Sequence, residues 1–182
     1  MGLSVENRRP PIAIVVMGVA GVGKTTVAEA LAERLGLPYG EADDFHPAAN
    51  IAKMAAGHPL DDQDREPWLR ALGAWLAERV ADGTGGVVTC SALKRSYRDL
   101  LRAACPGAFF LHLTGTEQLI EERIAHRSGH FMKAGMLDSQ LAILEPLGPD
   151  ENGARLDVGP APETLIESAV ALLPRPVNGD LA

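Results

Sequence analysis

The stretch Gly18-Val19-Ala20-Gly21-Val22-Gly23-Lys24-Thr25 decides the fold of this 182-residue chain. It fits the pattern G-x-x-x-x-G-K-[ST], the phosphate-binding loop of nucleotide-handling proteins. The apolar, β-branched segment Ile12–Met17 precedes it, as expected for a buried parallel strand. Residues 26–36 follow with apolar side chains at helical spacing and with Gly36 where a helix would end. Strand, glycine-rich loop and helix therefore occur in the order that the motif requires.

Each residue type in this loop has a physical role in binding an anion. Glycines let the backbone fold around a phosphate with its N–H groups pointing inward, and the helix that follows adds the partial positive charge of its N-terminus. Lys24 would reach the β- and γ-phosphates, and the Thr25 hydroxyl would ligate Mg²⁺. The loop alone does not separate a kinase from a GTPase or an ATP-driven motor.

Composition limits the class of protein. A chain of this length predicts one domain, which we expect over residues 11–173, with flexible tails at 1–10 and 174–182. The net charge of −7 argues against a general nucleic-acid binder. No apolar run approaches the roughly 20 residues that span a bilayer, and the N-terminus has no signal-peptide core. Two cysteines without disulfide or zinc spacing fit a reducing cytosol. We therefore expect a cytoplasmic protein with no membrane partner.

The rest of the chain alternates between strand and helix patterns. We expect further strands within 37–44, 86–90, 108–113 and 155–158, and helices near 50–57, 67–83, 95–104, 117–127, 137–144 and 162–173. This alternation predicts a three-layer α/β fold, in which a five-stranded parallel sheet carries helices on both faces. Ligands of such sheets bind beyond the carboxyl ends of the strands, so the loops after the strands should hold the chemistry.

Several local signals refine these expectations. Pro67 suits the first turn of its helix. Thr114 and Glu117 stand at the spacing of a capping box before the helix that follows. His112 lies within an apolar strand, where we expect a side chain with satisfied hydrogen bonds rather than a metal or substrate ligand.

The loop after the second strand is acidic and contains Glu41, Asp43, Asp44 and His46. A carboxylate facing the γ-phosphate could accept the proton of a substrate hydroxyl, or hold Mg²⁺ through water. The alternative is a solvated acidic turn.

Two groups of basic residues follow later strands. Lys94, Arg98 and Arg102 are four apart and share one face of a helix, where they could hold an anionic substrate or could be an ordinary exposed face paired with acids. Arg123 and Arg127 are also four apart and lead into Gly129-His130. This second pattern is typical of a lid, near 123–134, that closes over the phosphates.

Three longer runs resemble the signature of bacterial gluconokinases, which are ATP-dependent sugar-acid kinases of the shikimate-kinase-like P-loop class. The first is Asp43-x-x-His46-Pro47-x-x-Asn50-Ile51-x-Lys53-Met54-x-x-Gly57-x-Pro59-Leu60-x-Asp62-x-Asp64-Arg65-x-Pro67-Trp68-Leu69. The second is Cys90-Ser91-Ala92-Leu93-Lys94-x-x-Tyr97-Arg98-Asp99-x-Leu101-Arg102, and the third is Arg127-x-Gly129-His130-Phe131. The resemblance extends from about Ile12 to Leu173.

The resemblance implies phosphorylation of D-gluconate at its 6-hydroxyl with Mg-ATP, by a homodimer. It implies that the nucleotide is bound by Gly18, Val19, Ala20, Gly21, Val22, Gly23, Lys24, Thr25, Thr26 and Arg123. The catalytic residues would be Lys24, Asp43 and Arg127. The sugar acid would contact Asp43, His46, Lys94, Arg98, Arg127 and His130. Thr25 and Glu41 would serve the metal, with Glu41 standing where the family commonly has Asp.

Other classes of nucleotide-binding protein lack support in the sequence. Shikimate kinase would have a glycine-rich turn after the third strand, where Ser91-Ala92-Leu93 stands, and a nucleoside monophosphate kinase would start that loop with Asp-Gly. A regulatory GTPase would need an Asn-Lys-x-Asp motif, and the chain has no Asn-Lys pair. Lys24, Thr25 and Asp43 argue against a nucleotide-binding module without catalysis. Another small-molecule kinase of the same class remains the alternative.

Overall fold

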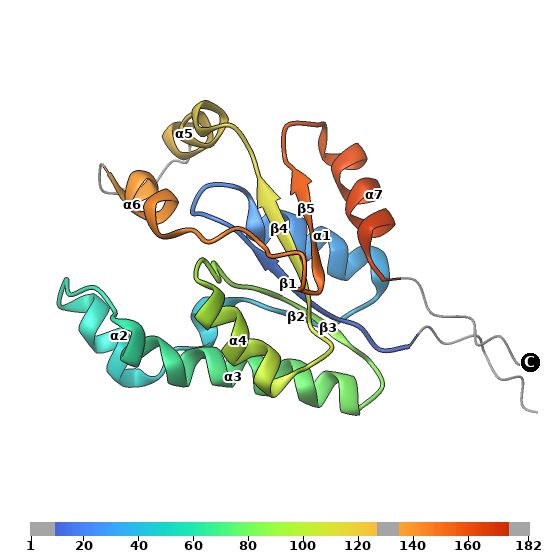
Figure 1. Ribbon diagram of the computed structural model, residues 1–182, viewed down its shortest axis with the longest axis horizontal. Coiled ribbons are helices and arrows are strands. Elements are labelled where there is room, and N and C mark those ends of the chain that lie inside the picture. Colours follow the sequence, from blue (N-terminus) through green and yellow to red (C-terminus); the bar gives the residue numbers. More distant parts are fainter. Residues whose placement is uncertain (1–9, 127–134, 175–182) are drawn as a thin grey trace, which may run out of the picture.

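A five-stranded parallel sheet forms the centre of the molecule (Figure 1). The computed structural model describes residues 10–126 and 135–174. The sheet order is β2-β3-β1-β4-β5, so the strand before the phosphate-binding loop is the central one. The strands are β1 (Ala13–Met17), β2 (Tyr39–Gly40), β3 (Gly86–Thr89), β4 (Phe109–Thr114) and β5 (Gly153–Asp157). The predicted five-stranded parallel sheet is confirmed.

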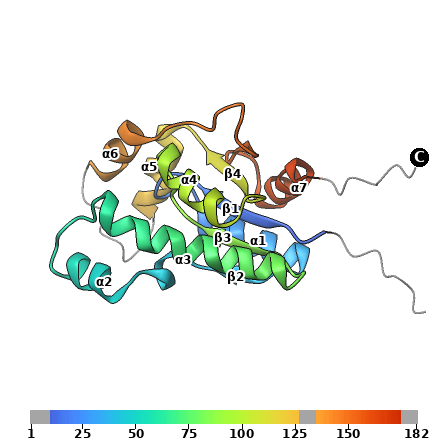
Figure 2. The same cartoon turned by 60° about the horizontal axis from the view of Figure 1, so that its bottom comes forward.

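Helices cover both faces of the sheet, as predicted (Figures 1 and 2). One face carries α1 (Lys24–Leu35) and α7 (Pro162–Leu172), and the other carries α3 (Asp62–Ala81) and α4 (Arg95–Ala104). The remaining elements are the 3₁₀ helix η1 (Ala42–Phe45), α2 (Ala48–Ala55), α5 (Glu117–His126) and α6 (Met136–Ile143).

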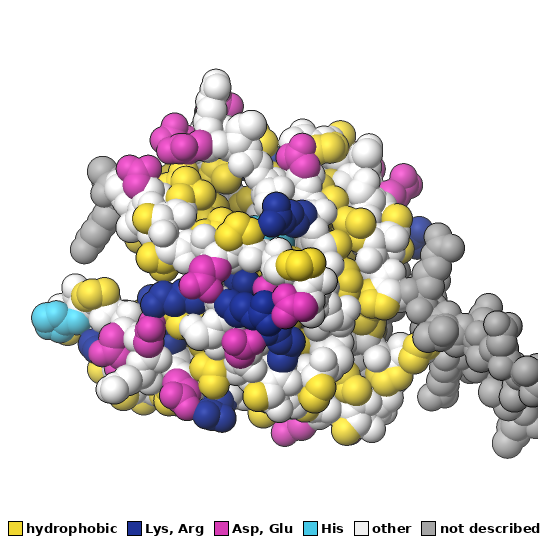
Figure 3. Space-filling view, in the orientation of Figure 1, with side chains coloured by type: hydrophobic (Ala, Val, Ile, Leu, Met, Phe, Trp, Pro, Cys, Tyr) yellow, Lys and Arg dark blue, Asp and Glu magenta, His cyan; other side chains and the backbone are white. Residues whose placement is uncertain are grey.

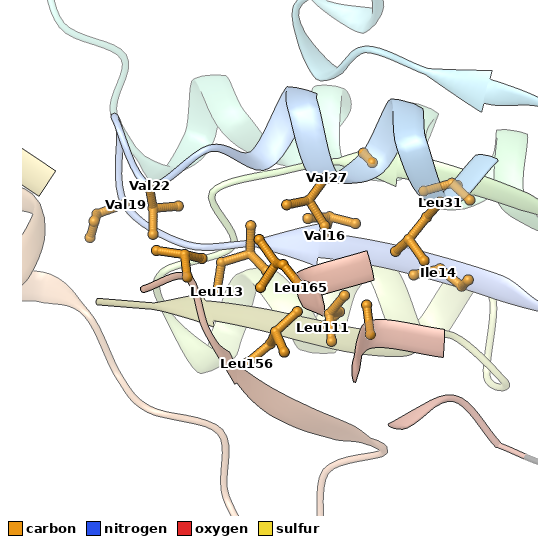
Figure 4. Close-up of a cluster of buried hydrophobic side chains, with 14 of the residues drawn as sticks. Ile14, Val16, Val19, Val22, Val27, Leu31, Leu111, Leu113, Leu156 and Leu165 are labelled. Atoms are coloured by element: carbon orange, nitrogen blue, oxygen red, sulfur yellow. The ribbon is translucent and has the colours of Figure 1, made fainter. Parts of the chain in front are cut away.

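Side chains of β1 alternate between two hydrophobic cores. Ile14 and Val16 pack with α1 and α7, whereas Val15 and Met17 pack with α3 and α4. All five residues of β1 are buried, which explains why the strand is a continuous apolar run rather than an alternating one. Figure 4 shows the first of these cores, in which Val27 and Leu31 of α1 lie over the sheet. The central strand is thereby held rigidly at the point where the phosphate-binding loop begins.

The predicted start of α3 is wrong. Helix α3 begins at Asp62, and Pro67 lies inside it rather than in its first turn. The reason is a capping box one turn earlier, in which Asp61 accepts from the Asp64 N–H and Asp64 accepts from the Asp61 N–H, both at 2.9 Å.

Thr114 is not a helix cap. Its hydroxyl donates to the Leu156 carbonyl at 3.4 Å as part of β4, and the Thr116 hydroxyl accepts from the Leu119 N–H at 3.2 Å at the start of α5. The spacing therefore identified the right helix but the wrong capping residue.

His112 also differs from expectation. It is buried in β4, and its Nδ1 has no hydrogen-bond partner among the residues that the structure describes. Burial, with the nearby positive charges of Arg155 and Arg98, lowers the pKa of His112 to about 4. The imidazole is therefore neutral at physiological pH.

The predicted tails, 1–10 and 174–182, lie outside the described residues except for Pro10 and Pro174. Within residues 10–126 and 135–174, no helix combines the length and the apolar character needed to cross a bilayer.

Candidate active site

The phosphate-binding loop connects the buried end of β1 to the N-terminus of α1. Its glycines allow close packing: Gly21 has φ +81°, and a Cβ there would lie 2.4 Å from Ile124 of α5. Gly18 donates its N–H to the Ser91 carbonyl at 3.3 Å, so the loop also rests on the segment after β3. Lys24 is the first residue of α1, and its Nζ donates to the Val19 carbonyl within the loop at 3.0 Å.

Glu41 lies beside Thr25, at the end of this loop where α1 begins. The Thr25 hydroxyl donates to Glu41 Oε2 at 3.0 Å, and Thr89 donates to Oε1 at 2.6 Å. Tyr39 also donates to Oε2. Burial opposes ionisation of Glu41, but these three hydrogen bonds outweigh it and lower the pKa of the carboxyl. The structure therefore brings together an ionised carboxylate and a hydroxyl, the hard oxygen donors that Mg²⁺ prefers.

Asp43 lies in η1, directly after the second strand, and is exposed. The turn that carries it is anchored from two sides. The Ala42 N–H donates to Thr89 Oγ1 at 3.1 Å, and the Trp68 indole N–H donates to the Ala42 carbonyl at 2.7 Å. These contacts fix the backbone that carries Asp43 between β3 and α3.

His46 stacks on Trp68, with ring centroids 4.4 Å apart and planes at 15°. Burial, together with the charge of Arg65, lowers the pKa of His46, while Asp43 opposes that shift. The ring is therefore neutral at pH 7 and can accept or donate a hydrogen bond. Trp68, a residue of the first long motif, thus packs against the His46 ring.

Lys94 lies at the N-terminus of α4, close to the N-terminus of α3. Its Nζ contacts both carboxylate oxygens of Asp62 at 2.9 and 3.0 Å, and the Tyr97 hydroxyl donates to the same carboxylate at 2.5 Å. The hydrogen bond to Asp62 raises the pKa of Lys94, which keeps its charge. A half-exposed cation paired with an exposed carboxylate can exchange that partner for an anionic substrate.

Arg98 corrects the prediction of a basic substrate-binding stripe. Its side chain is 0% exposed and pairs with Glu151, through Nε to Oε1 at 2.7 Å and Nη2 to Oε2 at 2.9 Å. Arg102 joins the same carboxylate at 2.7 Å. The three basic residues do share a helix face, but beyond Lys94 that face packs against the segment before β5. Arg98 therefore ties α4 to the segment before β5, and its guanidinium is buried in this structure.

The surface around this pair carries basic and acidic side chains in alternation (Figure 3). Arg95 pairs with Asp150, and Arg102 pairs with Asp99. Arg98 also donates to the Ala92 carbonyl at 2.9 Å, in the turn where Ala92 adopts φ +44°, a left-handed conformation that is rare for a residue with a side chain. The buried pair thus fixes the loop between β3 and α4.

We expect Arg98→Met to destabilise the protein by about 3–5 kcal/mol, because it leaves Glu151 buried without its main partner. Urea unfolding measures the change, and Arg95→Met, which breaks an exposed pair, should change it far less. The hydrogen bond from Arg98 lowers the pKa of Glu151 to about 2, from an ordinary 4.5. The pair therefore stabilises the fold above pH 4.5, and this contribution disappears as the pH falls towards 2. Equal acid sensitivity in the wild type and Arg98→Met would contradict this account.

A cavity of about 450 Å³ borders the phosphate-binding loop. It is lined by the loop, α1, α5 and α7, including Gly23, Thr26, Arg123, His126, Pro160 and Ile166. Arg123 donates to the Val22 carbonyl at 3.1 Å and to the Val158 carbonyl at 2.7 Å, so it connects the loop to the end of β5. The volume is that of a small-molecule site.

The structure brings most of the predicted site residues to one edge of the sheet. Arg127, His130 and the remainder of the predicted lid, 127–134, lie outside the described residues. Two residues near the site were not singled out from the sequence. Thr89 binds Glu41 and the Ala42 N–H, and Arg65 lies beside Tyr97. The Arg65 guanidinium lies 5.8 Å from the Tyr97 ring centroid and donates to the Leu60 carbonyl at 3.3 Å. Its place in the first long motif was the signal that could have identified it.

Comparisons with known proteins agree with this geometry. Residues 14–141 match the family described as an AAA domain. A gluconokinase from Gluconobacter oxydans is 48% identical over 160 residues, covering 88% of this chain and 90% of that protein. The crystal structure of a gluconokinase from Sinorhizobium meliloti has a TM-score of 0.78 and 47% identity, covering 90% and 92% of the two chains. Shikimate kinase from Aquifex aeolicus shares the fold alone, with a TM-score of 0.53, 12% identity and coverage of 88% and 94%.

A central β1, a phosphate-binding loop and a carboxylate beside its threonine define a P-loop nucleotide-binding protein. Within that class, the identity to curated gluconokinases over most of the chain is decisive. The chain belongs to the gluconokinase family.

Proposed function

We propose that this protein transfers the γ-phosphoryl group of ATP to the 6-hydroxyl of D-gluconate, giving 6-phospho-D-gluconate and ADP. The observation that carries the proposal is the arrangement at one sheet edge of Lys24, Asp43 and Lys94, in a chain that belongs to the gluconokinase family. The cavity beside Arg123 and Pro160 would take the adenosine, and the loop Gly18–Thr26 the triphosphate. The alternative, another sugar-acid or shikimate-type kinase, has no comparable support.

The reaction breaks the bond between the γ-phosphorus and the oxygen that bridges it to the β-phosphate. A bond from the gluconate 6-oxygen to phosphorus forms, and we propose that the hydroxyl proton passes to Asp43. Lys24 would offset the charge that develops on the phosphate oxygens. Arg127 would add a second positive charge from the proposed lid, with His130 beside the sugar acid.

Mg²⁺ fits the pair formed by Thr25 and Glu41. Their oxygens lie 3.0 Å apart beside the phosphate-binding loop, and Mg²⁺ is commonly held by one or two protein oxygens together with substrate phosphates and water. When bound, the ion would neutralise phosphate charge. The described residues contain no cluster of three or more His, Cys, Asp or Glu side chains that would form an all-protein metal cage.

The gluconate carboxylate would replace Asp62 as the partner of Lys94. We propose Lys94 and Arg65 as the cations of the acceptor site and His46 as a neutral hydrogen-bonding partner of the sugar hydroxyls. This assignment replaces Arg98, whose guanidinium is already occupied by Glu151.

Gluconate is expected to be a far better substrate than glucose or sorbitol, because neutral analogues leave the acceptor-site cations without a carboxylate. A coupled ADP-release assay over a panel of sugar acids, hydroxy acids and these neutral sugars tests the proposal. Lys94→Met should lower kcat/KM for gluconate by roughly ten- to a hundredfold, while KM for ATP barely changes.

The matched control is Arg70→Met, which breaks an exposed pair with Glu66 farther along α3 and should leave activity unchanged. Equal turnover of glucose and gluconate would refute a carboxylate-reading site. A preference for a different acid would leave the kinase assignment in place but would change the proposed substrate.

We also propose, from the family resemblance, that the protein is a cytoplasmic homodimer. Light scattering on the purified protein decides the oligomeric state.

A further inference from the structure

Helix α6 accepts a hydrogen bond from the backbone of the phosphate-binding loop. Gln140 Oε1 accepts the N–H of Ala20 at 2.7 Å, across 120 positions of sequence. The helix is held in place because Leu137 and Leu141 pack against the same core as Val19 and Val22. The contact is therefore a fixed part of the loop's surroundings, and the mechanism described above does not use it.

The position of Gln140 relative to the nucleotide follows from the two sides of the loop. The cavity proposed for adenosine is lined by Gly21, Val22 and Gly23, but not by Ala20. At the start of the loop, Gly18 rests on Ser91, in the segment that leads from β3 to the proposed acceptor residue Lys94. A triphosphate that extends from the cavity towards Asp43 must cross the loop in that direction. Its terminal phosphate would then lie at the end of the loop formed by Ala20 and Gln140.

The carboxamide of Gln140 carries an NH₂ group as well as its oxygen. Its oxygen is occupied by the Ala20 N–H, which orients the side chain and directs the NH₂ group away from that bond. Within residues 10–126 and 135–174, Gln140 Nε2 has no hydrogen-bond partner. An amide nitrogen carries two donors. A neutral donor on a preorganised side chain is the type of group that stabilises charge developing on phosphate oxygens.

We propose that Gln140 is a further catalytic residue, whose Nε2 donates a hydrogen bond to an oxygen of the γ-phosphoryl group during transfer. The proposal rests on the proposed kinase function but not on the identity of the acceptor. It predicts that Gln140 distinguishes a nucleoside triphosphate from a diphosphate, because only the former places an oxygen at this point.

The test is Gln140→Glu, which keeps the shape and an acceptor for the Ala20 N–H but replaces the donor with an anionic oxygen. We expect kcat to fall by about a hundredfold. Isothermal titration calorimetry should show at least tenfold weaker binding of a non-hydrolysable ATP analogue, with ADP affinity within twofold of the wild type. Gln140→Met, which lacks both groups, should lose less of the analogue affinity than the charged variant.

Gln118→Glu provides the same chemical change on α5, where Gln118 donates to Glu122 at 3.1 Å, and should behave as the wild type. Equal losses of ADP and ATP-analogue affinity in both Gln140 variants would mean that the side chain merely supports the loop, and would overturn the proposal. So would an unchanged kcat in Gln140→Glu. Because both nucleotide titrations omit the acceptor, their outcome stands even if the substrate is not gluconate.

Discussion

Lys24→Met is expected to reduce phosphoryl transfer by about a thousandfold, while the protein remains folded. Lys24 opens α1 and already directs its Nζ into the phosphate-binding loop, onto the Val19 carbonyl. Nucleotide phosphates in this loop would bring negative charge to that ammonium group, and methionine matches its length without the charge. The ADP-release assay measures the loss, and circular dichroism with thermal unfolding verifies the fold. Turnover near the wild-type rate in a folded variant would refute the kinase assignment.

Asp43→Asn is expected to lower kcat by about 10²–10⁴-fold and to change KM for ATP only a few-fold. Asparagine preserves shape and hydrogen bonding at this anchored turn, but it cannot accept the proton of the gluconate hydroxyl. Steady-state kinetics with each substrate varied in turn separates the two effects.

Asp44→Asn is the matched control, since Asp44 is the next residue of the same 3₁₀ turn and is also exposed. Similar small effects of both substitutions would mean that the turn contributes solvation rather than a base. A loss confined to KM for gluconate would make Asp43 a binding residue only.

The elements that locate the site were predictable from local sequence. The apolar run of β1, the glycines of the loop and the spacing in α1 each have one physical interpretation, and together they define the strand-loop-helix unit. The length of α3 was not predictable from Pro67, because the Asp61–Asp64 capping box competes with proline as a start signal.

The side-chain partners were harder to predict, because they depend on how elements pack. Spacing placed Lys94 and Arg98 on one face of α4 but could not say that this face meets Glu151, which lies 53 positions after Arg98. The contact of Gln140 could not be predicted for the same reason, since its partner Ala20 is remote in sequence. The cavity beside Pro160 likewise depends on the position of β5 at the sheet edge.

Both cysteines, Cys90 and Cys105, are buried. Burial raises the pKa of the Cys90 thiol to about 12, and it also raises that of Cys105. A protonated, enclosed thiol reacts slowly with maleimides and oxidants, because the thiolate is the nucleophile. The native cysteines can therefore stay in place when a single exposed cysteine is introduced for fluorescent labelling, for example at Ile51 on the surface of α2. The burial that stabilises the sheet thus makes the wild-type chain a suitable background for single-molecule measurements.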